Sequence, residues 1–356
     1  MLNYFVGEWS KLPSNKENLE RFLSLAPSLC LYDLGASGGV PPPFCWLGKG
    51  IELVNFEPDK RAEVDSHGRN CSVAIGPPAM RKLYINRRQT TSSLLPACES
   101  VVRRYDFCRL FPEEPRIFET VAIEEINTVG LDDAVRLFTL PCPDFLKIDV
   151  QGMTYEVLET GKNTLAGSTL GIQVEVEFLE TYTGQRTFGS VHDFLHEQGF
   201  EIFRLTNLNR WPYKTAMQLR TYTGQDVFCD LLYLRSLGHL ERFPEFWVPS
   251  RIIQHLRICL LYDLPDFAAA FMEKAIERRL IDADAVQDIT KLIMDWSDAL
   301  TFFFHCTHSV PEAAQGRRRQ FLHACVLMLK ALMPLSAYNA LASGYRLKHK
   351  RDRVDP

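Results

Sequence analysis

Carboxylate side chains stand at the ends of three short apolar runs, where they are placed to bind a ligand. Asp33 lies in the run 29–34, just before the glycine-rich turn 35–39, while Glu57 follows the run 51–56 and Asp149 ends the run 144–149. In parallel sheets of alternating strands and helices, ligands bind outside the carboxyl ends of the strands. We therefore expect the three carboxylates to face one crevice.

The charge of Asp33 indicates which ligand this crevice takes. Glycines after a strand let the backbone approach a ligand closely, and dinucleotide-binding turns place a pyrophosphate there. A carboxylate would oppose a pyrophosphate, but it suits the ammonium and sulfonium groups of S-adenosylmethionine. Glu57 has about the spacing, roughly 20 residues further on, expected of an acceptor for ribose hydroxyls. An ordinary tight turn is the alternative for the glycine segment.

Elements that would position these residues follow from the apolar patterns. β-rich runs alternate with helical or loop segments, as in a mostly parallel sheet with helices on both faces. The predicted strands are 29–34, 51–56, 71–75, 81–86, 119–123, 144–149, 171–177, 200–205 and 227–234. Helices that end at a glycine are predicted over 155–161 and 190–199.

Both ends of the chain have helical patterns instead. A capping box at 14–17 begins a helix before the sheet, and after residue 239 only helical spacing is found. The later helices are predicted over 251–262, 266–280, 283–305, 311–333 and 335–346. We therefore divide the chain into an N-terminal helical segment, 1–28, an α/β domain, 29–238, and a helical C-terminal extension, 239–356.

The composition is that of an ordinary globular protein. The 356 residues are 46% hydrophobic and 24% charged, with a net charge of −4, which gives no electrostatic reason to expect nucleic acid as a partner. Ten scattered cysteines form no Cys-x-x-Cys pair, and we expect reduced thiols in a cytoplasmic protein. We expect no signal peptide, because residues 1–11 lack a basic start and an unbroken apolar core, and no membrane span, because no apolar run reaches about 18 residues.

Five motifs together resemble the FkbM family of S-adenosylmethionine-dependent methyltransferases. They are Asp33-Leu-Gly-Ala36, Phe56-Glu-Pro58, Thr91-Ser-Ser-Leu94, Leu146-Lys-Ile-Asp-Val-Gln-Gly152 and Val174-Glu-Val-Glu177. They occur in the order of the family, over roughly residues 29–235. The resemblance implies a class I methyltransferase, Rossmann-like fold with a seven-stranded, mostly parallel sheet. It also implies S-adenosyl-L-methionine as the cofactor and, usually, O-methylation of a hydroxyl group.

The resemblance and the positions of the residues together assign the cofactor contacts. The methionine portion is assigned to Asp33, Gly35, Ser37 and Gly38, the ribose to Glu57, and the surroundings of ribose and adenine to Asp59, Ala74 and Ile75. The segment 91–93 resembles a hydroxyl-rich loop of the family that closes near the cofactor. A turn stabilised by its own hydroxyl groups is the alternative.

Carboxylates are also the candidates for catalysis, because an alcohol must lose its proton when it is methylated. Asp149 is our first choice, followed by Glu175 and Glu177, which share one face of the run 171–177. Structural carboxylates are the alternative for this pair. Lys147 is expected in an ion pair, and His192 on a helix surface. The family commonly has Glu where Gln151 stands and an acidic residue near Thr154. No dedicated set of metal ligands is evident in the sequence, and we expect no required metal.

These observations predict a cytoplasmic O-methyltransferase. Its acceptor would be a small molecule or glycan with a hydroxyl group: a glycan, a sugar nucleotide or a secondary metabolite. Whether the chain forms a homo-oligomer is left open. A non-catalytic binding or scaffold protein that retains the fold is the alternative. A nicotinamide enzyme is disfavoured, because the turn after Asp33 lacks a Gly-x-Gly opening.

Overall fold

The computed structural model describes residues 22, 24–41, 43–217 and 219–308, which divide into two compact units. The α/β unit consists of residues 28–41 and 47–244, and the helical unit of residues 1–27, 42–46 and 245–356. The predicted capping box at 14–17 and the predicted helices over 311–333 and 335–346 lie outside the described residues.

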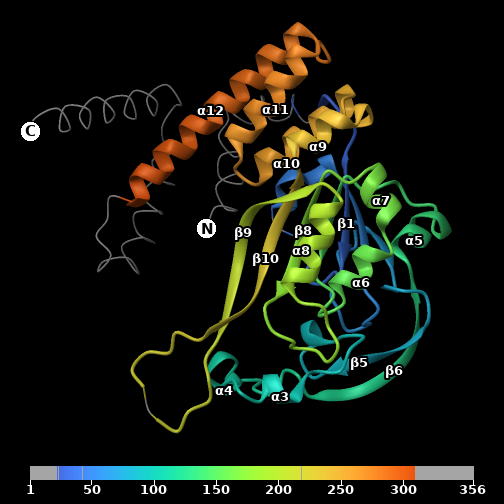
Figure 1. Cartoon of the computed structure of the whole chain (residues 1–356), viewed down its shortest axis with the longest axis vertical. Coiled ribbons are helices and arrows are strands. Elements are labelled where there is room, and N and C mark those ends of the chain that lie inside the picture. Colours follow the sequence, from blue (N-terminus) through green and yellow to red (C-terminus); the bar gives the residue numbers. More distant parts are fainter. Residues whose placement is uncertain (1–21, 23, 42, 218, 309–356) are drawn as a thin grey trace, which may run out of the picture. The chain divides into compact units, whose positions relative to one another are not determined.

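A seven-stranded sheet forms the centre of the α/β unit (Figure 1), in the order β3-β2-β1-β7-β8-β10-β9. Its strands are β1 (Leu29–Leu34), β2 (Ile51–Phe56), β3 (Arg69–Cys71), β7 (Phe145–Ile148), β8 (Gly171–Glu177), β9 (Phe200–Trp211) and β10 (Gln225–Arg235). The strand β10 runs antiparallel to both of its neighbours, β8 and β9, and the other strand pairs of this sheet are parallel. A sheet of this order with one antiparallel strand near its edge is the class I methyltransferase, Rossmann-like fold, as the sequence predicts.

The strand β1 lies inside this sheet and is buried along its whole length. It pairs in parallel with β2 on one side, Leu34 opposite Phe56, and with β7 on the other, Leu34 opposite Ile148. A parallel strand covered on both faces reads as a continuous apolar run, as 29–34 does apart from Asp33. The three strand ends that carry Asp33, Glu57 and Asp149 are therefore adjacent.

Three further strands form a separate small sheet, in the order β4-β6-β5. They are β4 (Ala74–Ile75), β5 (Met80–Asn86) and β6 (Thr120–Val129). The predicted run 71–75 is thus divided between the two sheets, and the predicted strand 119–123 continues to Val129. The periodicity of a short run indicates a strand, but it does not determine which partner that strand finds.

Helices α6 (Thr154–Glu159), α7 (Lys162–Gly167) and α8 (Phe188–Glu197) lie in front of the sheet in Figure 1, where α6 and α8 contact β8. The other helices of this unit are α3 (Glu99–Val102), α4 (Phe107–Leu110), α5 (Leu131–Leu137) and α9 (Leu237–Arg242), with 3-10 turns η1 (Phe44–Gly50, shared with the helical unit) and η2 (Gln89–Thr91). Apolar side chains of β1, β7, β8 and α8 form one buried core, which holds these strand ends in place.

The helical unit contains η3 (Pro244–Phe246, at its boundary) and three longer helices, α10 (Pro249–Leu261), α11 (Pro265–Glu277) and α12 (Ala283–His308). Proline begins both α10 and α11, where its missing N–H costs no hydrogen bond. Within this unit, the buried guanidinium of Arg257 donates hydrogen bonds to the carbonyl oxygens of Ala26 and Pro27. This anchors the segment before β1 to α10.

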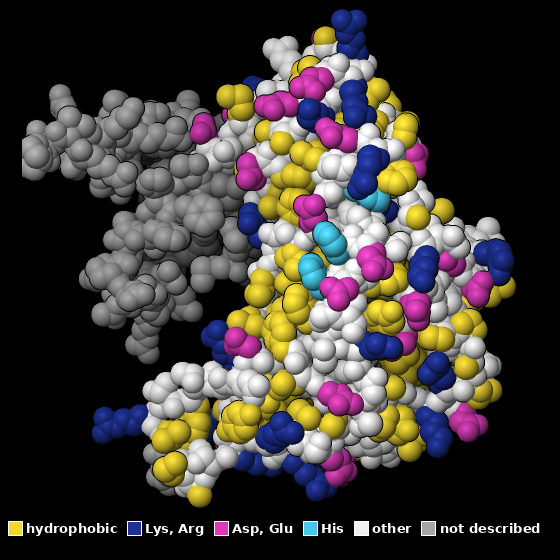
Figure 2. Space-filling model, in the orientation of Figure 1, with side chains coloured by type: hydrophobic (Ala, Val, Ile, Leu, Met, Phe, Trp, Pro, Cys, Tyr) yellow, Lys and Arg dark blue, Asp and Glu magenta, His cyan; other side chains and the backbone are white. Residues whose placement is uncertain are grey.

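Side chains of both charges are interspersed with hydrophobic ones on the face shown in Figure 2. The cysteines at positions 30, 45, 71, 98, 108, 142, 229 and 259 are free thiols. Each helix in the described part of the chain is too short or too polar to span a bilayer.

Candidate functional site

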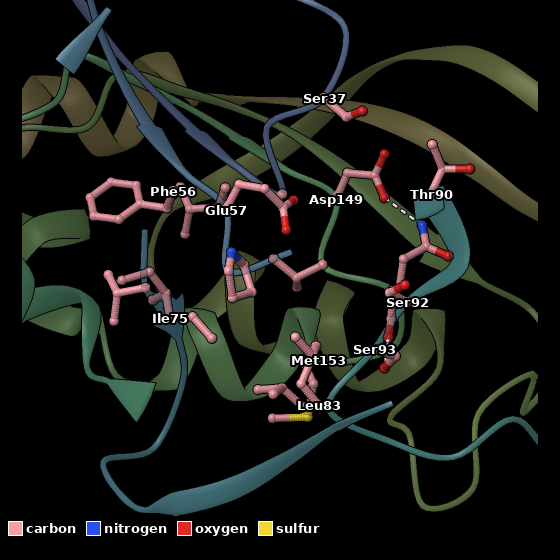
Figure 3. A pocket seen from close by; sticks show the side chains of 18 of the residues that line it. Ser37, Phe56, Glu57, Ile75, Leu83, Thr90, Ser92, Ser93, Asp149 and Met153 are labelled. Carbon is pink, nitrogen blue, oxygen red and sulfur yellow. Dashed lines mark hydrogen bonds between the residues drawn. The ribbon is translucent and has the colours of Figure 1, made fainter. Parts of the chain in front are cut away.

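A pocket of about 190 Å³ opens at the carboxyl ends of β1, β2 and β7. Its lining residues come from these strand ends, from β4 and β5, and from the segment 89–94. They are Leu34, Gly35, Ser37, Phe56, Glu57, Pro58, Val73, Ala74, Ile75, Leu83, Gln89, Thr90, Ser92, Ser93, Leu94, Lys147, Asp149, Val150, Gln151 and Met153. Figure 3 shows Ser37, Asp149 and Thr90 at one end of the pocket, with Leu83 and Met153 at the other.

The glycine turn brings the backbone of β1 against that of β7. Gly35 has a φ of +82°, and a Cβ atom there would lie 1.8 Å from the carbonyl oxygen of Asp149. Its N–H donates to the carbonyl oxygen of Phe56 at 2.9 Å, which ties the turn to β2 as well. Only glycine fits this contact. Gly38 also has a positive φ, +85°, but a Cβ atom would meet nothing within 4 Å.

Asp33 does not line the pocket. Its side chain is 1% exposed and lies 3.1 Å from the Nζ of Lys147, which forms the ion pair expected from the sequence. Burial raises the pKa of Asp33, although the charge of Lys147 opposes that shift. The same Nζ is 3.7 Å from Asp149 and donates to the carbonyl oxygen of Gly35 at 3.5 Å. Lys147 therefore joins the ends of β1 and β7.

Glu57 reaches the pocket from the end of β2 and is partly buried. Burial raises its pKa to about 7, and the charges of Asp59, Asp149 and Asp33 act in the same direction. Its Oε1 accepts a 2.6 Å hydrogen bond from the backbone N–H of Asp59. Asp59 itself does not line the pocket; its carboxylate binds Arg61 at 2.7 Å and accepts from the hydroxyl of Ser92 at 3.1 Å.

Asp149 is the second carboxylate that lines the pocket, and its side chain is 34% exposed. Its backbone N–H donates to the carbonyl oxygen of Leu34 at 2.9 Å, which continues the pairing of β1 with β7. The Nε2 of Gln151 donates to its Oδ1 at 2.6 Å (Figure 3). The carboxylate is thus held on one side and accessible from the pocket on the other.

Glu175 and Glu177 stand behind Asp149, on β8, and neither lines the pocket. Burial raises the pKa of Glu175 well above its usual value and that of Glu177 to about 8, and the charge of Asp149 adds to both shifts. Protons are therefore retained on these carboxyls to a higher pH than usual. This favours a supporting role over direct contact with a ligand.

The hydroxyl-rich segment 89–93 closes one side of the pocket. The hydroxyl of Ser93 donates to the carbonyl oxygen of Gln151 at 2.6 Å, and the guanidinium of Arg61 donates to the hydroxyl of Ser92 at 3.0 Å. Ser37 donates to the side chain of Gln89 at 3.2 Å, across from the glycine turn. The segment is therefore connected to the ends of β1, β2 and β7.

Of the residues predicted to contact the cofactor, the pocket is lined by Gly35, Ser37, Glu57, Ala74 and Ile75, but not by Asp33, Gly38 or Asp59. His192 lies on α8, where its ring is hydrogen-bonded to Tyr233 at 3.2 Å.

Leu83, Gln89 and Met153 also line the pocket and were not predicted. Gln89 lies two residues before the motif that begins at Thr91, so proximity to that motif was a usable signal. Leu83 had none, because it belongs to the small sheet. Within the described residues, no group of three His, Cys, Asp and Glu side chains is placed to hold a metal ion.

Comparison with known proteins decides the family. The model of the methyltransferase FkbM domain matches residues 35–202. These residues belong to the FkbM methyltransferase family. The matched range of this FkbM domain contains all of the pocket-lining residues except Leu34. The curated proteins compared with the chain gave no match.

Solved methyltransferases align with the chain at low similarity. A precorrin-6y C5,15-methyltransferase from Geobacter metallireducens is 14% identical, over 64% of this chain and 91% of that chain, with a TM-score of 0.27. A magnesium protoporphyrin IX methyltransferase from Synechocystis, solved with bound SAM, is 12% identical, over 65% and 81% of the two chains, with a TM-score of 0.27.

The cofactor of the FkbM domain is S-adenosyl-L-methionine, and the residues of the pocket fit it. Only glycine fits the close contact of residue 35 with β7, so no side chain covers this part of the pocket wall. Backbone atoms of the turn are therefore accessible to a ligand. A carboxylate, Glu57, is available to ribose hydroxyls, and apolar side chains line the end where Leu83 and Met153 lie (Figure 3). Adenine suits such an apolar wall.

Proposed function

We propose that the FkbM domain methylates a hydroxyl oxygen of a glycan, a sugar nucleotide or a secondary metabolite, and that Asp149 receives the hydroxyl proton. The observation that carries this proposal is the exposure of Asp149. Two carboxylates line the pocket, and Glu57 is the one placed for the ribose hydroxyls of the cofactor. The side chain of Asp149 is 34% exposed at the strand end where ligands collect in this type of sheet.

The bound cofactor supplies a methyl group that is already activated by its positive sulfur. The acceptor oxygen would form a bond to the methyl carbon as the carbon–sulfur bond breaks, and Asp149 would receive the hydroxyl proton. The protein contributes alignment and the exclusion of water, together with proton transfer that accelerates the step by about 100- to 10,000-fold. Gly35, Ser37 and Glu57 would hold the cofactor, with Ala74 and Ile75 near its adenine.

The test begins with isothermal titration of S-adenosylmethionine and its demethylated product into the wild-type chain. A panel of hydroxyl-bearing acceptors is then screened for transfer of a radiolabelled methyl group. We expect Asp149→Asn to bind the cofactor within about threefold of wild type and to lose at least about 100-fold in transfer rate. Asp226→Asn, which changes an exposed carboxylate paired with Arg210, is the matched control.

Two results would contradict the proposal. Undiminished transfer by Asp149→Asn would exclude this residue as the proton acceptor. Cofactor binding by the wild type without transfer to any acceptor would favour the scaffold alternative, in which the fold is retained without catalysis.

A further inference from the structure

Gln151 uses every polar atom of its side chain in contacts around the pocket. Its Nε2 donates to Oδ1 of Asp149 at 2.6 Å and to Oε1 of Glu175 at 2.9 Å, and its Oε1 accepts from the hydroxyl of Tyr182 at 2.8 Å. The backbone of Gln151 has a φ of +49°, which is uncommon for a residue with a side chain. An amide nitrogen carries two hydrogens, so both are used by carboxyl groups.

Tyr182 determines which way this amide points. Its hydroxyl lies 2.8 Å from Oε1 of Gln151 and 3.0 Å from the carbonyl oxygen of Thr91, which also accepts from Asn86 at 2.6 Å. The hydroxyl of Tyr182 therefore donates its single hydrogen to Oε1 of Gln151. The ring of Tyr182 is buried against Gly152, where an added Cβ would lie 2.9 Å from it. A flipped amide would direct its oxygen toward two carboxyl groups.

The surroundings of Asp149 and Glu175 are rich in charge. The titratable groups that face this pair are Lys147 on β7, Glu177 on β8, Cys229 and Asp230 on β10, Asp33 on β1, Glu57 at the end of β2, and Tyr182. Two carboxyl groups that share a site hold one proton between them more tightly than either would alone. An amide between them donates to both and does not itself titrate.

We propose that Gln151 is a positioning residue for Asp149: it holds this carboxylate toward the pocket and prevents it from sharing a proton with Glu175. The role of Asp149 rests on the proposed function, whereas the bridge between the two carboxyl groups does not. Gln151 acts through Asp149, because its amide hydrogens are both donated to carboxyl groups.

The test is the melting temperature of the full chain at pH 5 and pH 8, without added ligands. Gln151→Met keeps the length of the side chain and removes both donors, whereas Gln151→Glu supplies a donor only while it is protonated. Hydrogen bonds to charged groups stabilise more than hydrogen bonds to neutral ones. We therefore expect the loss of melting temperature in both variants to be larger at pH 8 than at pH 5, by about 4 °C or more. Tyr182→Phe should show a smaller loss of the same pH dependence.

Gln89→Met is the matched control, because Gln89 lines the same pocket and bonds a hydroxyl, that of Ser37. Its loss should be equal at the two pH values. Equal losses at both pH values for Gln151→Met and Gln151→Glu would overturn the proposal and leave Gln151 a packing residue. Failure of the wild type to bind S-adenosylmethionine would instead refute the proposed function, without affecting these melting temperatures.

Discussion

Burial divides the carboxyl groups around the pocket into two kinds. Asp33 is enclosed with Lys147, and its charge is matched inside the protein. Glu57 and Asp149 keep a surface that a ligand reaches. The sequence predicted that all three would meet at one crevice, because the ends of parallel strands are aligned. It did not predict that Lys147 would enclose Asp33, since the direction of that side chain depends on the pairing of β1 with β7.

Replacement of Glu57 should change stability in a pH-dependent way. The pKa of Glu57 is about 7 in the folded protein, above the value of 4.5 for a free glutamate. Its proton therefore favours folding below about pH 4.5, and this contribution is lost as the pH rises through 7. We expect Glu57→Gln to be more stable than wild type at pH 8, by up to about 3 kcal/mol, and equally stable at pH 4.5.

The measurement for Glu57→Gln is chemical unfolding at both pH values, with isothermal titration of S-adenosylmethionine beside it. Loss of a charged acceptor for the ribose should raise the dissociation constant at pH 8 by about tenfold. A stability difference that is the same at pH 4.5 and pH 8 would contradict the elevated pKa.

The two glycines of the turn offer a matched pair of substitutions. Gly35→Ala places a methyl group against the carbonyl oxygen of Asp149, whereas Gly38→Ala has free space and bears only the cost of a positive φ. We expect Gly38→Ala to lose about 1–2 kcal/mol, and Gly35→Ala to lose several kcal/mol and its cofactor binding. Thermal unfolding and cofactor titration of both variants would decide this, and equal losses would refute the importance of the contact.

At the scale of elements, three strands of the central sheet were predicted with the bounds that the structure has, whereas β9, predicted over 200–205, continues to Trp211. The bounds 29–34, 51–56 and 171–177 agree with β1, β2 and β8, because apolar residues of each run pack in the buried core of the sheet. The prediction 119–123 covered only the first part of β6, because Glu124, Glu125 and Asn127 interrupt the apolar pattern. Its pairing with β4 and β5 depends on contacts between distant segments, which periodicity does not encode.

The segment 89–93 shows how elements outside the main sheet complete the pocket. Its motif was predicted to lie near the cofactor, with a self-stabilised turn as the alternative. The structure contains both features: Thr91 bonds the carbonyl oxygens of Arg88 and Ile117 at 2.9 and 2.7 Å, while Ser92 and Ser93 line the pocket. In this hydroxyl-rich turn, some residues form internal hydrogen bonds and others line the pocket. The sequence alone does not distinguish the two groups.

At the scale of the whole molecule, the chain divides into an α/β unit that ends at residue 244 and a helical unit that also takes in residues 1–27 and 42–46, so these units do not follow the predicted domain boundaries. All of the pocket-lining residues belong to the α/β unit. We expect a chain that ends at residue 244 to bind S-adenosylmethionine within about threefold of the full chain. Isothermal titration measures this, with circular dichroism as the control for folding. A folded, truncated chain that does not bind would assign the helical extension a part in the site.

The order of the central sheet also has a consequence for biosynthesis. The end of β1 finds its neighbour β7 only after a separation of 114 residues, as the hydrogen bond from Cys30 to Asp144 illustrates. Contacts this distant in sequence form late, because a long loop must close first. On the ribosome, the glycine turn emerges well before the strand that completes its pocket. The nascent chain therefore gains its ligand site only when β7 has been translated and released from the exit tunnel.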